Sequence, residues 1–146
     1  MNRIDSAKGP EMQETAKLLF ANDAFYNAFS RRDVAAMEQV WARHSPVTCI
    51  HPGWQALTSL DEVMESWRAI LGNANAPPIS CRGSRAFIKG DVGWVVCYEV
   101  IGGAVLAAGN VFVREDGAWV LSHHQAGPCE SLPAELAGDP PSEPVQ

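Results

Sequence analysis

The feature that most constrains the fold is a stretch from residue 79 to residue 125 in which hydrophobic residues recur at every second position. Three short turn sequences interrupt it, at Lys89-Gly90-Asp91, Gly102-Gly103 and Asp116-Gly117. Alternation of this kind is typical of β-strands, and glycine and aspartate in such turns tolerate positive φ. We therefore predict an antiparallel meander with strands near Ile79–Lys89, Trp94–Ile101, Val105–Arg114 and Trp119–Gln125.

Three helices are predicted before the meander. Residues 14–30 carry apolar side chains at helical spacing, and Asp33 can cap a second, shorter helix. Ser59 and Glu62 form a capping box for a third helix, which Gly72 ends. This order indicates an α+β fold in which three N-terminal helices pack on one face of a curved antiparallel sheet.

The uncovered face of the sheet should also be apolar. Trp94, Val96 and Tyr98 alternate with Val95 and Cys97, so both faces of this strand carry hydrophobic side chains. An exposed apolar sheet face is typical of an interaction surface. We therefore expect a homodimer formed through this open face.

Length and composition indicate one soluble domain. The chain has 146 residues, 47% of them hydrophobic, and lacks an apolar run of the roughly 18 residues that a membrane span needs. The first residues contain no apolar segment typical of a secretion signal, so we expect a cytoplasmic protein without membrane contact. A net charge of -6 without a basic stripe argues against nucleic-acid binding.

The positions of the prolines and cysteines bear on the domain boundaries and on metal or redox sites. We expect an N-terminal extension at 1–13, a domain at 14–127 and a tail at 128–146 that holds five of the ten prolines and should be mobile or lie over the surface. The four cysteines, at positions 49, 81, 97 and 129, are too widely spaced for a zinc ribbon or a redox Cys-x-x-Cys pair. We expect reduced thiols, no metal and no cofactor.

The segment from Ser45 to Trp54 contains the first candidate site residues. A short β run carries Cys49 and His51 on one face and ends at Pro52-Gly53. Counting back from the Asp116-Gly117 turn places Asn110 opposite His123. The same counting across Gly102-Gly103 adds Glu99 to that face, unless a β-bulge reverses the parity.

These residues predict a bowl that suits a small, largely apolar ligand with one or two oxygen atoms. The catalytic candidates are His51, Asn110 and His123, and the ligand-binding candidates are Tyr26, Cys49, Trp54, Trp67 and Glu99. His123 and His124 are adjacent in a strand and cannot both face the bowl, and which of them does so is left open. Alternatively, Glu99 has a structural role and forms an ion pair with Arg82 or Arg85.

Most of the chain, residues 15 to 127, resembles the nuclear transport factor 2-like superfamily, and in particular its SnoaL-like and association-domain-like bacterial members. The resemblance is carried by Phe25-Tyr26-Asn27-Ala28-Phe29 with Arg32-Asp33, by Cys49-Ile50-His51-Pro52, by Asp61-Glu62-Val63 with Ser66-Trp67, and by Gly109-Asn110-Val111-Phe112 with Trp119 and His123-His124. It implies a cone-shaped, cystatin-like α+β barrel, usually dimeric, with a pocket between the helices and the sheet.

The ketosteroid isomerase pattern within this superfamily is not matched at its reacting positions. By the resemblance, His51 stands at the proton-abstracting aspartate, Phe25 or Tyr26 at the oxyanion tyrosine, and Asn110 near the second acid. Steroid isomerisation is therefore not expected. Two functions stay open: a ligand-binding or assembly domain without catalysis, and an isomerase, cyclase, dehydratase or hydrolase with His51 as general base.

Overall fold

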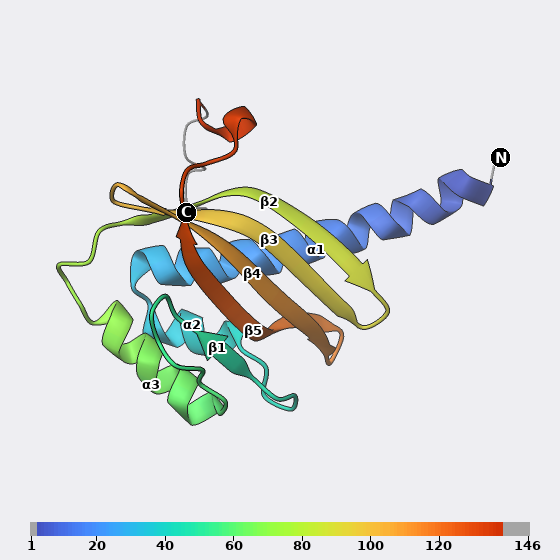
Figure 1. The fold of residues 1–146 in the computed structure, drawn as a ribbon. Helices are drawn as coiled ribbons and strands as arrows, with labels where there is room; N and C mark the ends of the chain where they lie inside the picture. Colours follow the sequence, from blue (N-terminus) through green and yellow to red (C-terminus); the bar gives the residue numbers. More distant parts are fainter. Residues whose placement is uncertain (1–2, 139–146) are drawn as a thin grey trace.

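The structure is a computed structural model that describes residues 3–138, and it confirms the predicted α+β fold (Figure 1). The elements in chain order are α1 (Arg3–Arg31), α2 (Val34–Val40), β1 (Thr48–Ile50), α3 (Leu60–Leu71), β2 (Ile79–Lys89), β3 (Val92–Ile101), β4 (Ala104–Glu115), β5 (Ala118–Cys129) and a 3₁₀ helix (Ala134–Leu136). The strands form one open sheet in the order β1-β5-β4-β3-β2.

The sheet is mixed, which corrects the prediction of an antiparallel sheet. Strands β2 to β5 form the predicted meander, but β1 pairs with β5 in parallel, with Thr48 opposite His123 and Ile50 opposite Gln125. The chain between β1 and β5 includes α3 and three strands, so nothing local in the sequence reveals this pairing.

The local signals for turns and caps are confirmed. Asp116 and Gly117 both have positive φ, at 51° and 79°, as a two-residue turn that matches the strand twist requires. The side chain of Ser59 accepts a hydrogen bond from the Glu62 N–H at 3.2 Å, and Asp33 accepts one from Ala36 at 3.0 Å. Both helices therefore begin where the capping residues predict.

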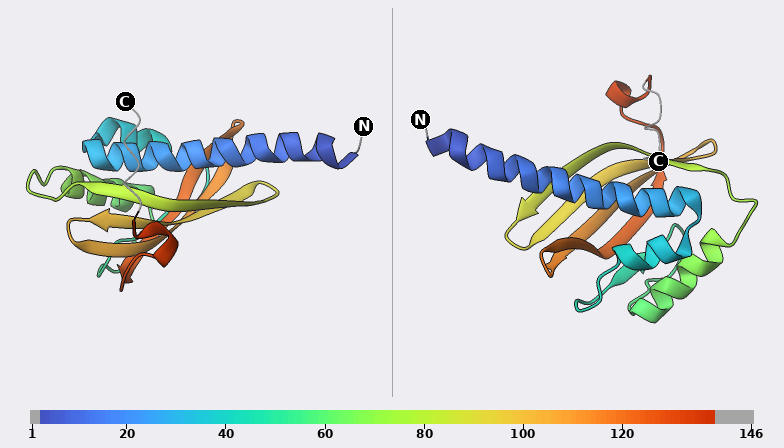
Figure 2. Two further views of the ribbon diagram at one scale, coloured as in Figure 1. Left: turned by 90° about the horizontal axis from the view of Figure 1, so that it is seen from above. Right: turned by 180° about the vertical axis from the view of Figure 1, so that it is seen from behind.

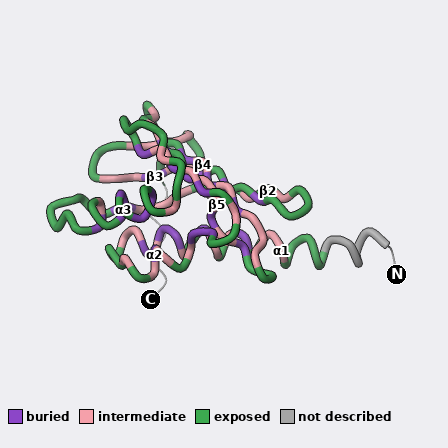
Figure 3. Tube along the Cα trace, turned by 90° about the horizontal axis from the view of Figure 1, so that it is seen from below, coloured by how far each residue is buried: buried purple, intermediate pink, exposed green. Residues whose placement is uncertain are grey.

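Helix α1 crosses one face of the sheet, here called the inner face (Figure 2). Gly93 of β3 permits this close approach, because a Cβ there would lie 2.7 Å from Cδ2 of the fully buried Leu18. The buried residues concentrate where the second half of α1 and the other helices meet the sheet, whereas residues 9–17 of α1 are largely exposed (Figure 3).

The opposite face, here called the open face, carries exposed apolar side chains on β2 and β3. Phe87 and Trp94 stack at a ring-centroid distance of 5.7 Å, and both are more than a third exposed. Val92 and Val96 continue this surface at 41% and 42% exposure. The predicted apolar character of this face is thus present, although its role as a dimer interface stays a prediction.

Two boundaries differ from the prediction by more than two residues. Helix α1 begins at Arg3 instead of Glu14. Strand β5 continues to Cys129, because Pro128 and Cys129 pair with Leu106 and Val105 in place of starting the tail. The described part of the predicted tail, 128–138, contains the end of β5 and the 3₁₀ helix, and residues 139–146 lie outside the described residues. Among residues 3–138, no helix combines the length and the hydrophobicity needed to cross a membrane.

Candidate functional site

Seven polar side chains meet between α1, α3 and the inner face of the sheet, and we call them the inner polar cluster. They are Asn22, Tyr26, His51, Ser66, Glu99, Asn110 and His124, and each is at most 6% exposed. They come from α1, α3, β3, β4, β5 and the residue that follows β1. The predicted members His51, Tyr26, Glu99 and Asn110 are therefore brought together.

His124, and not His123, is the histidine that faces Asn110, which corrects the predicted pairing. The pairing counted back from the Asp116-Gly117 turn is correct from Arg114 opposite Trp119 to Phe112 opposite Leu121. A β-bulge between Val111 and Phe112 then shifts the register by one residue. A shift of one residue exchanges the two faces of a strand. His123 therefore lies on the other face, where its Nδ1 is 2.6 Å from Oγ1 of Thr48.

A directed chain of hydrogen bonds runs through the cluster. The Asn110 amide donates through Nδ2 to Asn22 Oδ1 at 2.9 Å and to Tyr26 Oη at 3.2 Å. Its Oδ1 lies 2.6 Å from His124 Nδ1 and can only accept, so His124 carries its proton on Nδ1. The Nε2 atom of His124 thus keeps a lone pair, 3.8 Å from Oε2 of Glu99.

Glu99 is the ionisable group whose surroundings are most unusual. The Tyr26 hydroxyl donates to its Oε2 at 2.7 Å. Burial raises the pKa of Glu99 to about 7, and the Tyr26 hydrogen bond opposes this rise only in part. The predicted ion pair with Arg82 or Arg85 is wrong, because those residues pair with Tyr98 and Val96, whose side chains belong to the open face.

His51 is neutral and has a fixed tautomer. Ser66 uses its only hydroxyl proton to donate to the Val63 carbonyl at 2.6 Å, so its oxygen accepts from His51 Nε2 at 2.9 Å. His51 therefore keeps its lone pair on Nδ1. Burial lowers the pKa of His51 to about 4. Burial also lowers the pKa of His124 to about 3, and electrostatic interaction with the neighbouring His51 and His123 acts in the same direction.

Aromatic and sulfur groups surround the two histidines. The ring of Trp67 lies 4.9 Å from the His51 ring and 5.9 Å from the His124 ring. Its Nε1 is buried and has no hydrogen-bond acceptor among the described residues. Trp54, by contrast, is 46% exposed and lies against the solvent side of His51 at 4.9 Å. Cys49 is buried beside His51, and burial raises its pKa to about 12, so it is a thiol at neutral pH.

The cluster is enclosed, in contrast to the open bowl that the sequence predicts. Three cavities lined by described residues lie elsewhere. One of about 650 Å³ lies between α1, α2 and the β4–β5 turn, one of about 450 Å³ on the open face at β3 to β5, and one of about 220 Å³ beside Phe29 and Ile79. Ligand access to the cluster thus stays a prediction, and the nearest exposed segment is the loop 52–56, which carries Trp54.

The cluster offers both hydrogen-bond donors and acceptors in neutral form. The neutral imidazoles supply lone pairs at His51 Nδ1 and His124 Nε2, while Trp67 Nε1 is a donor. Such a set can hold a carbonyl or hydroxyl oxygen on an otherwise apolar molecule. Asn22, Ser66 and His124 were not predicted as site residues. Asn22 and Ser66 are single polar residues on helices, whose spacing alone does not indicate a site, and the side on which His124 lies depends on a β-bulge.

Comparisons with known proteins agree with this architecture. Residues 19–129 match the model of the SnoaL-like domain. A proposed dehydratase of the nuclear transport factor 2-like family from Streptomyces avermitilis is 27% identical, with a TM-score of 0.72 over 82% of this chain and 98% of that one. A proposed calcium/calmodulin-dependent protein kinase type II association domain from Thiobacillus denitrificans is 31% identical, with a TM-score of 0.64 over 75% and 93%.

A curated relative is the F-box protein SKIP8 of Arabidopsis thaliana, which is 25% identical over 114 residues. This match covers 77% of the chain but 49% of the relative, so the chain spans about half the length of that protein. The family model covers most of the chain, and the solved structures share its helices and sheet. The chain therefore belongs to the SnoaL-like domain family, with a nuclear transport factor 2-like, cystatin-like fold.

Proposed function

We propose that the chain binds a small, largely apolar molecule with one or two oxygen atoms at the inner polar cluster. The observation that carries this proposal is the convergence of seven buried polar side chains from six parts of the chain in the middle of an apolar core. Burying polar groups stabilises a fold less than packing apolar ones of the same size. Side chains with shifted pKa values gather at functional sites more often than elsewhere.

Trp67 supports the proposal because its indole N–H has no acceptor among residues 3–138. A buried donor without an acceptor costs about 1 to 3 kcal/mol. An oxygen atom of a bound molecule would remove this cost. The ligand enters beside His51, where loop 52–56 is exposed and Trp54 covers the imidazole.

The test uses 1-naphthol and naphthalene, which share an apolar ring system and differ by one hydroxyl. Calorimetric titration should give at least tenfold tighter binding of 1-naphthol, equal to about 1.4 kcal/mol. Tyr26→Phe and Trp67→Phe should reduce this preference, whereas Ala35→Phe, at an exposed alanine of α2, should not. Equal affinity for the two compounds in the unchanged protein would reject the proposal.

Acid–base catalysis with His51 as general base is the second candidate, as in an isomerase, cyclase, dehydratase or hydrolase. Its neutral state and the Ser66 hydrogen bond favour a role as proton acceptor. A pKa of about 4 makes it a weak base at neutral pH, which is why binding ranks first. Exchange of the α-protons of 2-tetralone in D₂O tests this candidate: His51→Gln should abolish catalysed exchange in a protein that remains folded.

We also propose a homodimer through the open face. The stacked Phe87 and Trp94 and the adjacent Val96 form an apolar surface that one copy alone leaves in water. Light scattering at micromolar concentration should give twice the monomer mass. Val96→Lys should give a monomer, and Phe20→Lys, on the other side of the molecule, should not. A monomer in the unchanged protein contradicts this proposal.

A further inference from the structure

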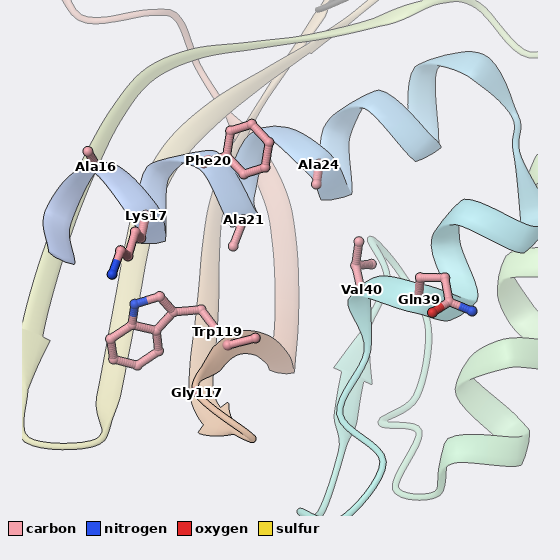
Figure 4. A pocket seen from close by; sticks show the side chains of 10 residues that line it. Ala16, Lys17, Phe20, Ala21, Ala24, Gln39, Val40, Gly117 and Trp119 are labelled. Atoms are coloured by element: carbon pink, nitrogen blue, oxygen red, sulfur yellow. The ribbon is translucent and has the colours of Figure 1, made fainter. Parts of the chain in front are cut away.

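An apolar cavity, here called the hairpin groove, lies outside the inner polar cluster, between α1, α2 and the β4–β5 turn (Figure 4). Its volume of about 650 Å³ is within the range of small-molecule sites. The lining residues that matter for binding are Lys17, Phe20, Ala24, Val40, Gly117 and Trp119. Small side chains leave the hollow open, and a Cβ added at Gly117 would meet no atom within 4 Å.

Two nitrogen donors lie at one end of this groove. Trp119 is 8% exposed, and its Nε1 is buried without an acceptor among the described residues. Figure 4 shows the Lys17 side chain extending from α1 toward the indole nitrogen of Trp119. Lys17 and Trp119 thus both line the apolar hollow, and together they supply a cation and a neutral N–H donor, a combination that suits an anionic oxygen acceptor.

Lys17 can exchange its present partner at little cost. Its Nζ is 3.2 Å from Oε1 of Glu14, and the lysine side chain is 66% exposed, so this ion pair is weak. Glu14 has a better partner in Arg114, whose Nη1 lies 2.7 Å from Oε2 and whose guanidinium lies over the Trp119 ring. Arg114 thus continues to neutralise Glu14 when Lys17 moves to a ligand.

We propose that the hairpin groove binds an amphipathic organic anion, with its apolar part against Phe20, Ala24 and Val40 and its anionic oxygens at Lys17 and Trp119 Nε1. Phe20 is 70% exposed and supplies an apolar wall that the fold itself does not cover. The groove lies between α1, α2 and the β4–β5 turn, and none of its lining residues belongs to the inner polar cluster, so the two sites are distinct.

The experiment follows the fluorescence of 8-anilinonaphthalene-1-sulfonate bound to the full chain, and its displacement by decanoate, decan-1-ol and decylamine. Decanoate should displace the dye at the lowest concentration. Lys17→Gln should weaken decanoate by about tenfold or more, the usual effect of losing one charge-assisted hydrogen bond, and leave decan-1-ol unchanged. Lys89→Gln, which removes the same charge at the β2–β3 turn, should change neither.

A second pair of variants tests the place of binding. Ala24→Phe fills the groove and should abolish dye binding, whereas Ala35→Phe, an exposed alanine of α2 that is not part of the lining, should not. Any of three results overturns the proposal: equal displacement by decylamine and decanoate, equal effects of Lys17→Gln and Lys89→Gln, or full dye binding in Ala24→Phe. Dye binding lost only in Val96→Lys would place the dye on the open face and overturn it as well.

Discussion

Asn110 and His124 are joined by a contact of 2.6 Å between Oδ1 and Nδ1, across the inner face of β4 and β5. Since Asn110 uses its Nδ2 hydrogens for Asn22 and Tyr26, its oxygen must accept from His124. This single amide therefore orients three other members of the inner polar cluster. It also determines which imidazole nitrogen of His124 faces Glu99.

The first prediction concerns the tautomer of His124. At pH 7, ¹⁵N NMR of histidine-labelled protein should show a neutral ring with the proton on Nδ1. His51 should show the opposite tautomer, with the proton on Nε2, because Ser66 accepts there. A proton on Nε2 of His124 would show that Asn110 does not act as the acceptor.

The β-bulge between Val111 and Phe112 predicts unequal roles for two adjacent histidines. His124→Ala should destabilise the protein by about 3 kcal/mol in urea unfolding. The change leaves a cavity, and the buried Oδ1 of Asn110 loses its hydrogen-bond donor. His123→Ala should cost less than about 1 kcal/mol, because that side chain lies on the open face beside Thr48. The reverse order would mean that the bulge is absent.

Glu99 predicts a specific dependence of stability on pH. Its pKa rises from 4.5 to about 7 on folding, so the folded state holds an extra proton between these values, and stability from this group falls as pH rises through that window. Glu99→Gln, which stays neutral, should therefore become more stable relative to the unchanged protein by up to about 3 kcal/mol between pH 4.5 and 8.

His51 and His124 act in the opposite direction in the unchanged protein. Their lowered pKa values mean that the stability of these groups is complete above about pH 6.5 and is lost as pH falls toward 4 and 3. Both histidines are present in the unchanged protein and in Glu99→Gln, so their contribution cancels when the stabilities of the two proteins are subtracted. A difference between the two proteins that stays constant with pH would show that folding does not raise the pKa of Glu99.

The close approach of α1 to β3 predicts a steric effect at Gly93. Gly93→Ala should destabilise the fold by about 1 to 2 kcal/mol, because the new Cβ would meet Leu18, which is fully buried and cannot move into solvent. Gly109→Ala is the matched control in β4, where a Cβ meets nothing within 4 Å. Thermal unfolding of both variants measures the difference, and equal effects would argue against this packing of α1.

The sequence predicts the meander because its turns depend on local dipeptides, such as those at 102–103 and 116–117. The start of α3 is equally local, since the capping box at Ser59 spans four residues. It does not predict the parallel pairing of β1 with β5, which joins segments more than 70 residues apart. The choice between His123 and His124 depends on one extra residue in β5, Ser122, and alternation alone cannot locate such a bulge.

The candidate site could be predicted in composition but not in its degree of enclosure. His51, Glu99 and Asn110 follow from strand parity and face counting, and the structure brings them together. Their burial depends on how the rings of Phe25, Trp54 and Trp67 fill the space around them, which is a property of packing and not of spacing.

The most direct measurement is a titration of histidine-labelled protein with 1-naphthol, followed by ¹⁵N NMR of the four imidazoles. If the ligand binds at the inner polar cluster, the ring resonances of His51 and His124 shift with saturation while those of His44 and His123 stay in place. Saturable binding that moves only His44 or His123, or none of the four, would contradict the proposed site.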